Sequence, residues 1–199
     1  MRKSLGFQDV AKFNKRIVRL QSMMRGFSVR RQFMMEQEPG KFDDQMDMDT
    51  LIKNQTVKDV LEREGAFKFS ELDPRSLRAP KDIKLVTKGP WRRDKDGAVY
   101  IGQWNRDLTM KVGSGSKIWA DGSIYEGQWV RNRANGFGRL IHTDGDIYEG
   151  EWFNDKAHGK GVFKAVDGAI YTGDWRDDEQ HGHGVETWND ESRYEGQYF

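Results

Sequence analysis

Histidine is the first side chain to consider as a reactive group, because imidazole binds metals and exchanges protons near neutral pH. His158 and His181 each follow a tyrosine by ten residues, at the position that Asn135 takes one unit earlier. His183 lies between two glycines and His142 precedes an Asp-Gly pair. None of these histidines has another histidine four residues away, and the chain has no cysteine. We therefore interpret His158 and His181 as turn residues and predict no metal site.

Two other patterns look like ligand sites but lack the residues that define them. Residues 43–49 hold four aspartates without the glycine and the terminal glutamate of a calcium loop, so we interpret them as solvated charge. The triplet Gly136-Phe137-Gly138 is not followed by Lys-Ser or Lys-Thr, as a phosphate-binding loop would be. No nucleophile has a paired base. The sequence predicts a protein that is not an enzyme and has no cofactor.

The composition favours an elongated array with an extension over one thick domain. Of 199 residues, 36% are hydrophobic and 33% are charged, which leaves little aliphatic material for a two-layer core. Aromatic residues make up 12%, so burial falls mainly to Trp, Tyr and Phe. The absence of cysteine favours a reducing compartment, and no apolar run of 18 residues or signal-like start occurs. We expect a cytoplasmic protein without a membrane span.

The net charge of +1 conceals an uneven distribution. Residues 2–31 contain nine Lys or Arg and one acid, whereas residues 36–49 are mostly acidic. We expect the basic amino-terminal segment to bind an acidic partner.

The second half of the chain repeats one pattern, in which a glycine follows a tyrosine by two residues and an aromatic residue follows the glycine by two. The tyrosines are 25, 23, 23 and 23 residues apart, and a Gly-x-Gly triplet begins 12 residues before each following tyrosine. The repeated residues are Tyr100, Gly102, Trp104, Tyr125, Gly127, Trp129, Tyr148, Gly150, Trp152, Tyr171, Gly173, Trp175, Tyr194 and Gly196.

Each unit reads as a strand, a turn and a second strand. Side chains two residues apart share a face of a strand, so Tyr, Gly and Trp lie together and the glycine leaves room for the rings. Polar residues then point to the other face, which we expect to be solvated or occupied by a partner: Glu126, Gln128, Glu149 and Glu151. We predict one turn over residues 154–158 and another at each Asp-Gly pair, because both residues of the pair tolerate positive φ.

This pattern resembles the MORN repeat family over roughly residues 91–199. The first unit departs from it by two extra residues before Gly113, and Asp190-Glu191 replaces an Asp-Gly pair. The resemblance implies a mainly β fold: an elongated single-layer antiparallel β-meander used for scaffolding, dimerisation or docking. Arrays of this kind resemble those of radial-spoke head proteins in the axoneme. Some family members are fused to phosphoinositide kinases.

The amino-terminal segment carries an apolar stripe flanked by basic residues. Phe13, Ile17, Leu20, Met24 and Phe27 are spaced four, three, four and three residues apart, which predicts one face of an amphipathic helix. A groove in an acidic partner accepts this shape, with apolar anchors for affinity and basic residues for steering.

The same segment resembles the IQ motif, which calmodulin and related EF-hand proteins bind. The matching residues are Leu20, Gln21, Arg25, Gly26, Arg30 and Phe33. The resemblance implies that Gln21 hydrogen-bonds the partner, Gly26 permits close approach, and Arg25 and Arg30 meet acidic side chains. Two alternatives remain open: the helix packs on the array or another protein, or it makes weak contact with an anionic membrane.

Residues 39–90 form a linker whose first part is acidic. A short helix is predicted over residues 56–64, with Thr56 as its cap and Gly65 at its end. This linker is expected either to cover the open first edge of the array or to clamp a neighbouring protein.

The sequence therefore divides into residues 1–38, a basic helix with the IQ-like motif; residues 39–90, the linker; and residues 91–199, four repeats and the start of a fifth. We expect a structural adaptor in a cytoskeletal assembly, most specifically a ciliary axoneme, with calmodulin-like and axonemal partners. The alternatives are a peripheral membrane scaffold and a regulatory region of a phosphoinositide kinase-like protein. The acidic array argues against nucleic acid.

Overall fold

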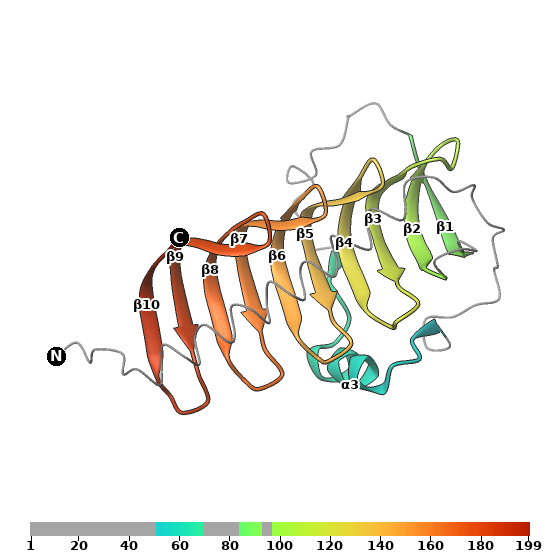
Figure 1. Ribbon diagram of the computed structural model, residues 1–199. Coiled ribbons are helices and arrows are strands. Elements are labelled where there is room, and N and C mark those ends of the chain that lie inside the picture. Colours follow the sequence, from blue (N-terminus) through green and yellow to red (C-terminus); the bar gives the residue numbers. More distant parts are fainter. Residues whose placement is uncertain (1–50, 70–83, 93–96) are drawn as a thin grey trace.

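The repeats form one open antiparallel sheet. The computed structural model describes residues 51–69, 84–92 and 97–199. Its ten strands are paired in chain order from β1 to β10, each with the next, as a single-layer meander (Figure 1). This confirms the fold class expected from the sequence. The residues expected to form the amino-terminal helix lie outside the described ranges.

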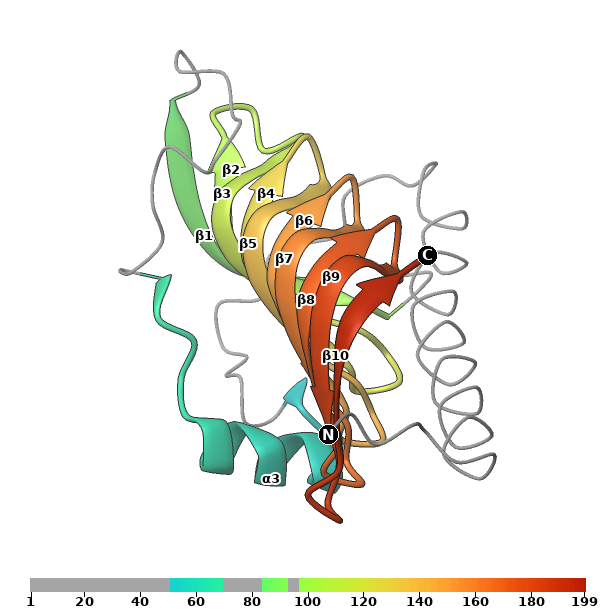
Figure 2. The ribbon, with the colours of Figure 1, turned by 90° about the vertical axis from the view of Figure 1, so that its left-hand side faces the viewer.

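The strands are short and evenly spaced along the chain. Their bounds are β1 Leu85–Arg92, β2 Val99–Asn105, β3 Lys111–Ile118, β4 Ile124–Val130, β5 Arg133–Ile141, β6 Ile147–Phe153, β7 Lys156–Lys164, β8 Ile170–Arg176, β9 Glu179–Thr187 and β10 Arg193–Tyr198. Helix α3 spans Gln55–Glu64. Figure 2 looks along the row of strands and shows that they curve together, with α3 beside one end of them.

One side of the sheet, here called the aromatic face, carries the repeated tyrosines and tryptophans. The ring of Tyr125 meets Trp129 of its own strand edge-on at 5.1 Å and Trp152 of the next repeat at 5.1 Å. The same pair of contacts recurs from Tyr100 to Tyr171, with Tyr198 in place of tryptophan at the end. Edge-to-face packing is the favoured geometry for such rings, so the ladder joins each repeat to the next.

A row of glycines lies beneath these rings. Paired glycines continue across the sheet from β2 to β10: Gly102, Gly115, Gly127, Gly138, Gly150, Gly161, Gly173, Gly184 and Gly196. Each repeated tyrosine ring lies against this row, where a Cβ would collide with it. The second glycine of each Gly-x-Gly triplet is therefore required by the tyrosine of the adjacent strand.

The two ends of the hairpins use different turns. At one end, here called the tight-turn end, two residues with positive φ make three of the four connections: Arg131-Asn132, Asn154-Asp155 and Asp177-Asp178. The prediction of a turn over residues 154–158 was wrong, because Asn and Asp tolerate positive φ and two such residues suffice. As a result, His158 and His181 lie inside β7 and β9 and are not turn residues.

At the other end of the hairpins, the aspartate and the glycine of each Asp-Gly pair have different roles. Gly122, Gly145 and Gly168 have φ of 94°, 96° and 84°, but their aspartates are not at positive φ. Each aspartate instead accepts a hydrogen bond from the backbone N–H two residues on. In the last copy Glu191 takes the glycine position at φ 62°.

Helix α3 packs on the side of the sheet away from the aromatic face, here called the opposite face. Its cap is Asn54, not Thr56 as predicted, because the Asn54 side chain accepts the Val57 N–H at 3.1 Å. Val57 and Val60 are buried against four isoleucines of β3 to β6: Ile118, Ile124, Ile141 and Ile147. The helix does not cover the first edge of the array, which was one expected role of the linker. Strand β1 pairs with β2 at that edge. Within the described ranges, no helix is long and apolar enough to cross a membrane.

Candidate interaction surface of the repeat array

The polar residue between the repeated glycine and tryptophan has a structural role. Gln128 was expected to be solvated or to meet a partner, but it is buried, and its Oε1 accepts the Phe137 N–H at 2.8 Å. The equivalent bonds join Gln103 to Ser114, Glu151 to Lys160 and Asp174 to His183. Sequence reasoning missed this role, although every unit carries Gln, Glu or Asp there. The residue accepts the backbone N–H at the centre of the adjacent Gly-x-Gly triplet.

Glu126 is also buried, against expectation, because it pairs with Arg139 under the segment that follows α3. Arg139 Nη2 lies 2.7 Å from Glu126 Oε2 and also donates to the Gly65 carbonyl at 2.9 Å. The Phe67 ring lies 5.6 Å from the guanidinium group and stacks on Phe137 at 6.5 Å. Burial raises the pKa of Glu126, and the charge and hydrogen bond of Arg139 partly oppose that rise. Residues 65–69 are thus held on the opposite face of β4 and β5.

The seat of α3 ends where the isoleucine pairs end. The pairs Ile118–Ile124 and Ile141–Ile147 are followed by Lys164–Ile170 and then Thr187–Arg193 in the same register. Lys164 marks the boundary through an ion pair with Glu64 at 2.6 Å. Beyond this boundary no apolar strip remains to hold a helix, so α3 has one position on the array.

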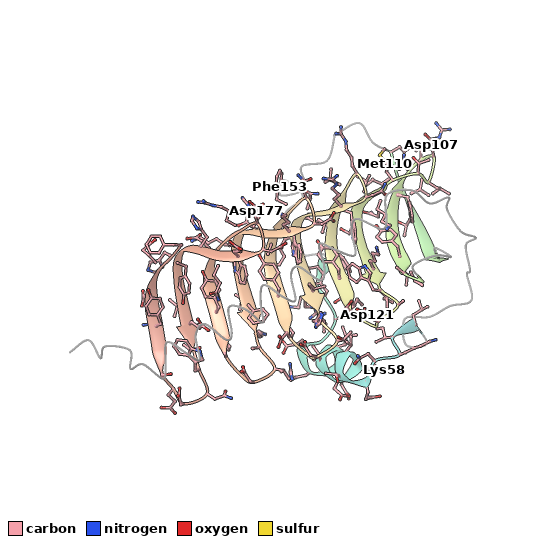
Figure 3. The ribbon with its side chains drawn as sticks, viewed as in Figure 1. Lys58, Asp107, Met110, Asp121, Phe153 and Asp177 are labelled. Atoms are coloured by element: carbon pink, nitrogen blue, oxygen red, sulfur yellow. The ribbon has the colours of Figure 1, made fainter. Side chains whose placement is uncertain are left out.

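Within the described ranges, no helix packs on the opposite face of β8 to β10 or at the tight-turn end of β6 and β7, and we call this region the open surface. Phe153 and Ile170 are 41% and 39% exposed on it. Its charged side chains are mixed in sign: Glu149, Glu151, Lys160, Asp174, Arg176, Arg193 and Glu195. Figure 3 shows Phe153 and Asp177 at the tight-turn end of this region, with Asp121 and Lys58 near the other end of the hairpins.

Hydrogen bonds fasten each repeat to the one before it. At the tight-turn end, Asp155 Oδ1 accepts the Ala134 N–H at 2.6 Å, and Asn132 and Asp178 make the same bond one repeat away. On the aromatic face, Trp152 Nε1 donates to the Gly138 carbonyl at 3.0 Å, and Trp129 and Trp175 do likewise. These bonds recur at successive steps and connect neighbouring repeats along the array.

The tyrosines of the ladder are hydrogen-bond donors. Tyr125 donates its hydroxyl proton to the Gln128 carbonyl at 3.1 Å, and Tyr148 and Tyr171 make the equivalent bond. Burial raises the pKa of Tyr125 well above its ordinary value, so the hydroxyl stays protonated at physiological pH. The tyrosine hydroxyl groups of the ladder therefore serve as hydrogen-bond donors to the backbone of the sheet.

Several sequence predictions concern residues that the structure does not describe. The IQ-like residues and the aspartates of residues 43–49 lie outside the described ranges. Within those ranges, no group of three or more His, Cys, Asp or Glu is placed to hold a metal ion. Residues 97–199 contain 17 Asp or Glu and 11 Lys or Arg, which disfavours a surface that follows phosphates.

Comparison with known proteins identifies the repeated unit. The family described as MORN repeat matches residues 100–124, 125–147, 148–170 and 171–193. Each matched segment begins at a tyrosine of the ladder, so the family pattern and the structural repeat share one register. No curated protein matches the chain.

Among solved structures, the chain is similar to the TCP domain of SAS-4 (dCPAP) of Drosophila melanogaster, solved in complex with a proline-rich motif of Ana2 (dSTIL). The identity is 7% and the TM-score 0.35, over 55% of this chain and 58% of that chain.

Proposed function

From the premise that this chain carries four MORN repeats, we propose that it is a non-enzymatic adaptor in a cytoskeletal assembly. The observation that carries the proposal is the fastening of every repeat to the next by rings, glycines and turn side chains. A scaffold must hold a fixed length, and nine strands from β2 to β10 at a spacing of about 4.8 Å give a row of roughly 40 Å. The open surface lies along this row.

In this proposal the amino-terminal segment recruits a calmodulin-like EF-hand protein. The apolar stripe from Phe13 to Phe27 supplies anchors, and Gln21, Arg25 and Arg30 supply polar contacts. The nine basic residues in residues 2–31 suit an acidic partner. The array has an excess of acidic residues, so it is not expected to attract such a partner itself.

The assembly we propose is the ciliary axoneme, with a radial-spoke-like position. Support for this location comes from the resemblance of the repeats to radial-spoke head proteins. The alternatives are a peripheral membrane scaffold and a regulatory region of a phosphoinositide kinase-like protein. The acidic excess of residues 97–199 disfavours an anionic membrane as the array's own ligand.

The light-chain part is tested by binding of calmodulin to the full chain, measured by calorimetry with and without calcium. Replacing Gln21, Arg25 and Arg30 by alanine should abolish binding, while replacing Lys3, Lys12 and Lys15 by alanine, outside the motif, should weaken it only modestly. Equal losses in the two triple variants would show that charge alone drives the interaction. Unchanged binding in the first variant would refute the IQ assignment.

The cellular part is tested by purifying the protein from its native source and identifying the proteins that remain bound. Tubulin or dynein-associated proteins support the axonemal proposal. Liposome flotation of the full chain that survives removal of residues 1–33 would instead establish the membrane scaffold.

A further inference from the structure

The turns at the tight-turn end change from basic to acidic along the array. The first residue of each two-residue turn and the first residue of the strand after it recur at intervals of 23 residues, so they occupy equivalent positions in successive repeats. The residues at these two positions are Arg131 and Arg133 between β4 and β5, Asn154 and Lys156 between β6 and β7, and Asp177 and Glu179 between β8 and β9. The charge at equivalent positions therefore reverses over two repeats.

The side chains at both ends of this gradient reach solvent. Arg131, Asp177 and Glu179 are exposed, and Arg133 is half-buried. Asp177 pairs with Lys156 at 3.4 Å, and its side chain remains 60% exposed in that pair. Within the described ranges, no ion pair joins Arg131, Arg133 or Glu179 to another side chain. We call Arg131 and Arg133 the basic patch, and Asp177 and Glu179 the acidic patch.

The two patches lie on either side of the β6–β7 hairpin. Each is one repeat away from it, and one repeat adds two strands to the sheet, so the patches are roughly 19 Å apart. Phe153, which is 41% exposed, comes directly before the turn of this middle hairpin. Figure 3 shows Phe153 and Asp177 on the same edge of the sheet. This edge therefore presents a basic patch, an apolar ring and an acidic patch in that order.

We propose that the tight-turn end is an interface between two copies of this chain, related by a two-fold axis through the β6–β7 hairpin. The two rows of turns run in opposite directions across this interface, so the basic patch of each copy meets the acidic patch of the other. A two-fold contact makes each of these interactions twice. The spacing of the patches matches in the two copies by symmetry, and Phe153 of each copy lies near the axis.

Charge complementarity favours a second copy as the occupant. A different partner would need its own pair of opposite patches at the same spacing. A head-to-tail chain of copies would leave one patch unpaired at each end, whereas a closed pair satisfies both patches of both copies. The net charge of the chain is only +1, so repulsion between copies is small. Each exposed ion pair contributes little, so the dimer is weak and sensitive to salt.

Sedimentation equilibrium of the full chain tests for the dimer. In about 50 mM salt, a rising protein concentration should convert monomer to dimer, and about 500 mM salt should weaken the association roughly tenfold or more, because exposed charges are then screened. A monomer at every concentration, or growth beyond the dimer without limit, would overturn the proposal. The measurement needs no EF-hand protein, so its result is independent of the proposed light-chain function.

Exchange of the two patches identifies the surface. One double variant combines Arg131→Asp with Arg133→Glu, and the other combines Asp177→Arg with Glu179→Arg. Arg131 and Asp177 have φ of 49° and 51°, so each turn receives a residue type that the equivalent turn already carries. Each double variant should weaken association roughly tenfold or more, because patches of like charge then face each other.

The chain with all four substitutions keeps the original net charge and has its patches exchanged. It should dimerise as the unaltered chain does, with circular dichroism used to check that the sheet persists. Lys53→Glu with Arg63→Glu is the control for the first double variant, because it makes the same change in net charge at exposed positions away from the tight-turn end. An equal loss in this control, or no recovery in the chain with four substitutions, would overturn the proposed pairing.

A cysteine near the axis tests the two-fold arrangement. The chain has no cysteine, so Lys156→Cys introduces a single thiol beside the turn of the middle hairpin. Two such thiols lie close together across the proposed axis, and oxidised glutathione should join them in a disulfide-linked dimer. Lys53→Cys, at an exposed position before α3, should give several-fold less of this product. Equal yields from the two variants at low salt would overturn the arrangement.

Discussion

The phenol ring of Tyr148 lies against Gly161 of the neighbouring strand. A Cβ placed on Gly161 would be 2.5 Å from the tyrosine hydroxyl oxygen and 2.7 Å from two ring carbons. The Tyr148 ring therefore packs directly on the backbone of Gly161, and the same ring packs on Trp152 and Trp175. The absence of a Cβ at Gly161 thus allows the Tyr148 ring to take the position in which it joins two repeats.

Gly161→Ala should destabilise the array strongly. The added methyl group pushes the Tyr148 ring away from its two tryptophans, and overpacking of this kind costs about 1–3 kcal/mol or more. Gly65→Ala is the control, because Gly65 has φ 74° but no atom within 4 Å of a new Cβ. Gly65 has φ 74° and ψ 178°, a conformation that alanine rarely adopts, so its cost of about 1–3 kcal/mol comes from backbone strain alone. Chemical denaturation measures both, and a near-neutral Gly161→Ala would contradict the role of Gly161 in supporting the Tyr148 ring.

Trp152→Ala should reduce the free energy of unfolding by about 3–5 kcal/mol, because the indole is almost completely buried. Trp152→Phe keeps most of the packing but removes the hydrogen bond to the Gly138 carbonyl, so a smaller loss of about 1–3 kcal/mol is expected. Near-neutral effects in thermal or denaturant unfolding would mean that the ring serves a partner and not the fold.

Asp155→Ala should loosen the contact between adjacent repeats. It leaves the buried Ala134 N–H without its acceptor, at a cost of about 1–3 kcal/mol. Asp155→Asn should recover most of the loss, because Asn132 already makes the same bond one repeat earlier and Asn tolerates positive φ. Hydrogen exchange at Ala134 reports the change directly. Equal exchange in the Ala and Asn variants would contradict the role of the Asp155 side chain as acceptor of the Ala134 N–H.

Glu191→Gly should stabilise the protein. Glu191 holds φ 62° at the position that glycine takes in the three preceding turns, so relief of strain should add about 0.5–1 kcal/mol after the entropic cost of glycine. The melting temperature of the variant measures this gain. A decrease would show that the Glu191 side chain makes a contact that outweighs its backbone strain.

Glu126→Ala should cost about 3–5 kcal/mol, because it removes the side chain that the buried Arg139 guanidinium binds. Glu195→Gln, which breaks an exposed pair with Arg193, should change stability by no more than about 0.5 kcal/mol. Comparable losses in the two variants would contradict the distinction between buried and exposed pairs.

The same carboxyl group predicts a pH dependence. Because burial raises the pKa of Glu126, the folded chain holds this proton more tightly than the unfolded chain does. Its contribution to stability is therefore greatest in acid and falls as pH rises from the ordinary glutamate pKa through the raised value. Unfolding free energies measured across this range should show a downward component that is missing in Glu126→Gln.

Much of the array could be predicted from local patterns. Alternation within Tyr-x-Gly-x-Trp identified the shared face, and the 23-residue step identified the meander. The errors arose where local residue types permit more than one geometry. Asn154-Asp155 closes a turn in two residues, which moved His158 into a strand, and Gln128 turned toward a backbone N–H where solvent was expected.

The sequence by itself determined the strand order and the composition of the aromatic face, because both follow from short-range periodicity repeated at a constant interval. The tertiary structure alone decided where α3 lies and what covers Glu126. Arg139 binds a carbonyl 74 residues away, and the isoleucines that seat the helix come from two separate hairpins. Contacts of that range depend on how the curved sheet brings distant residues together, and no local pattern encodes that distance.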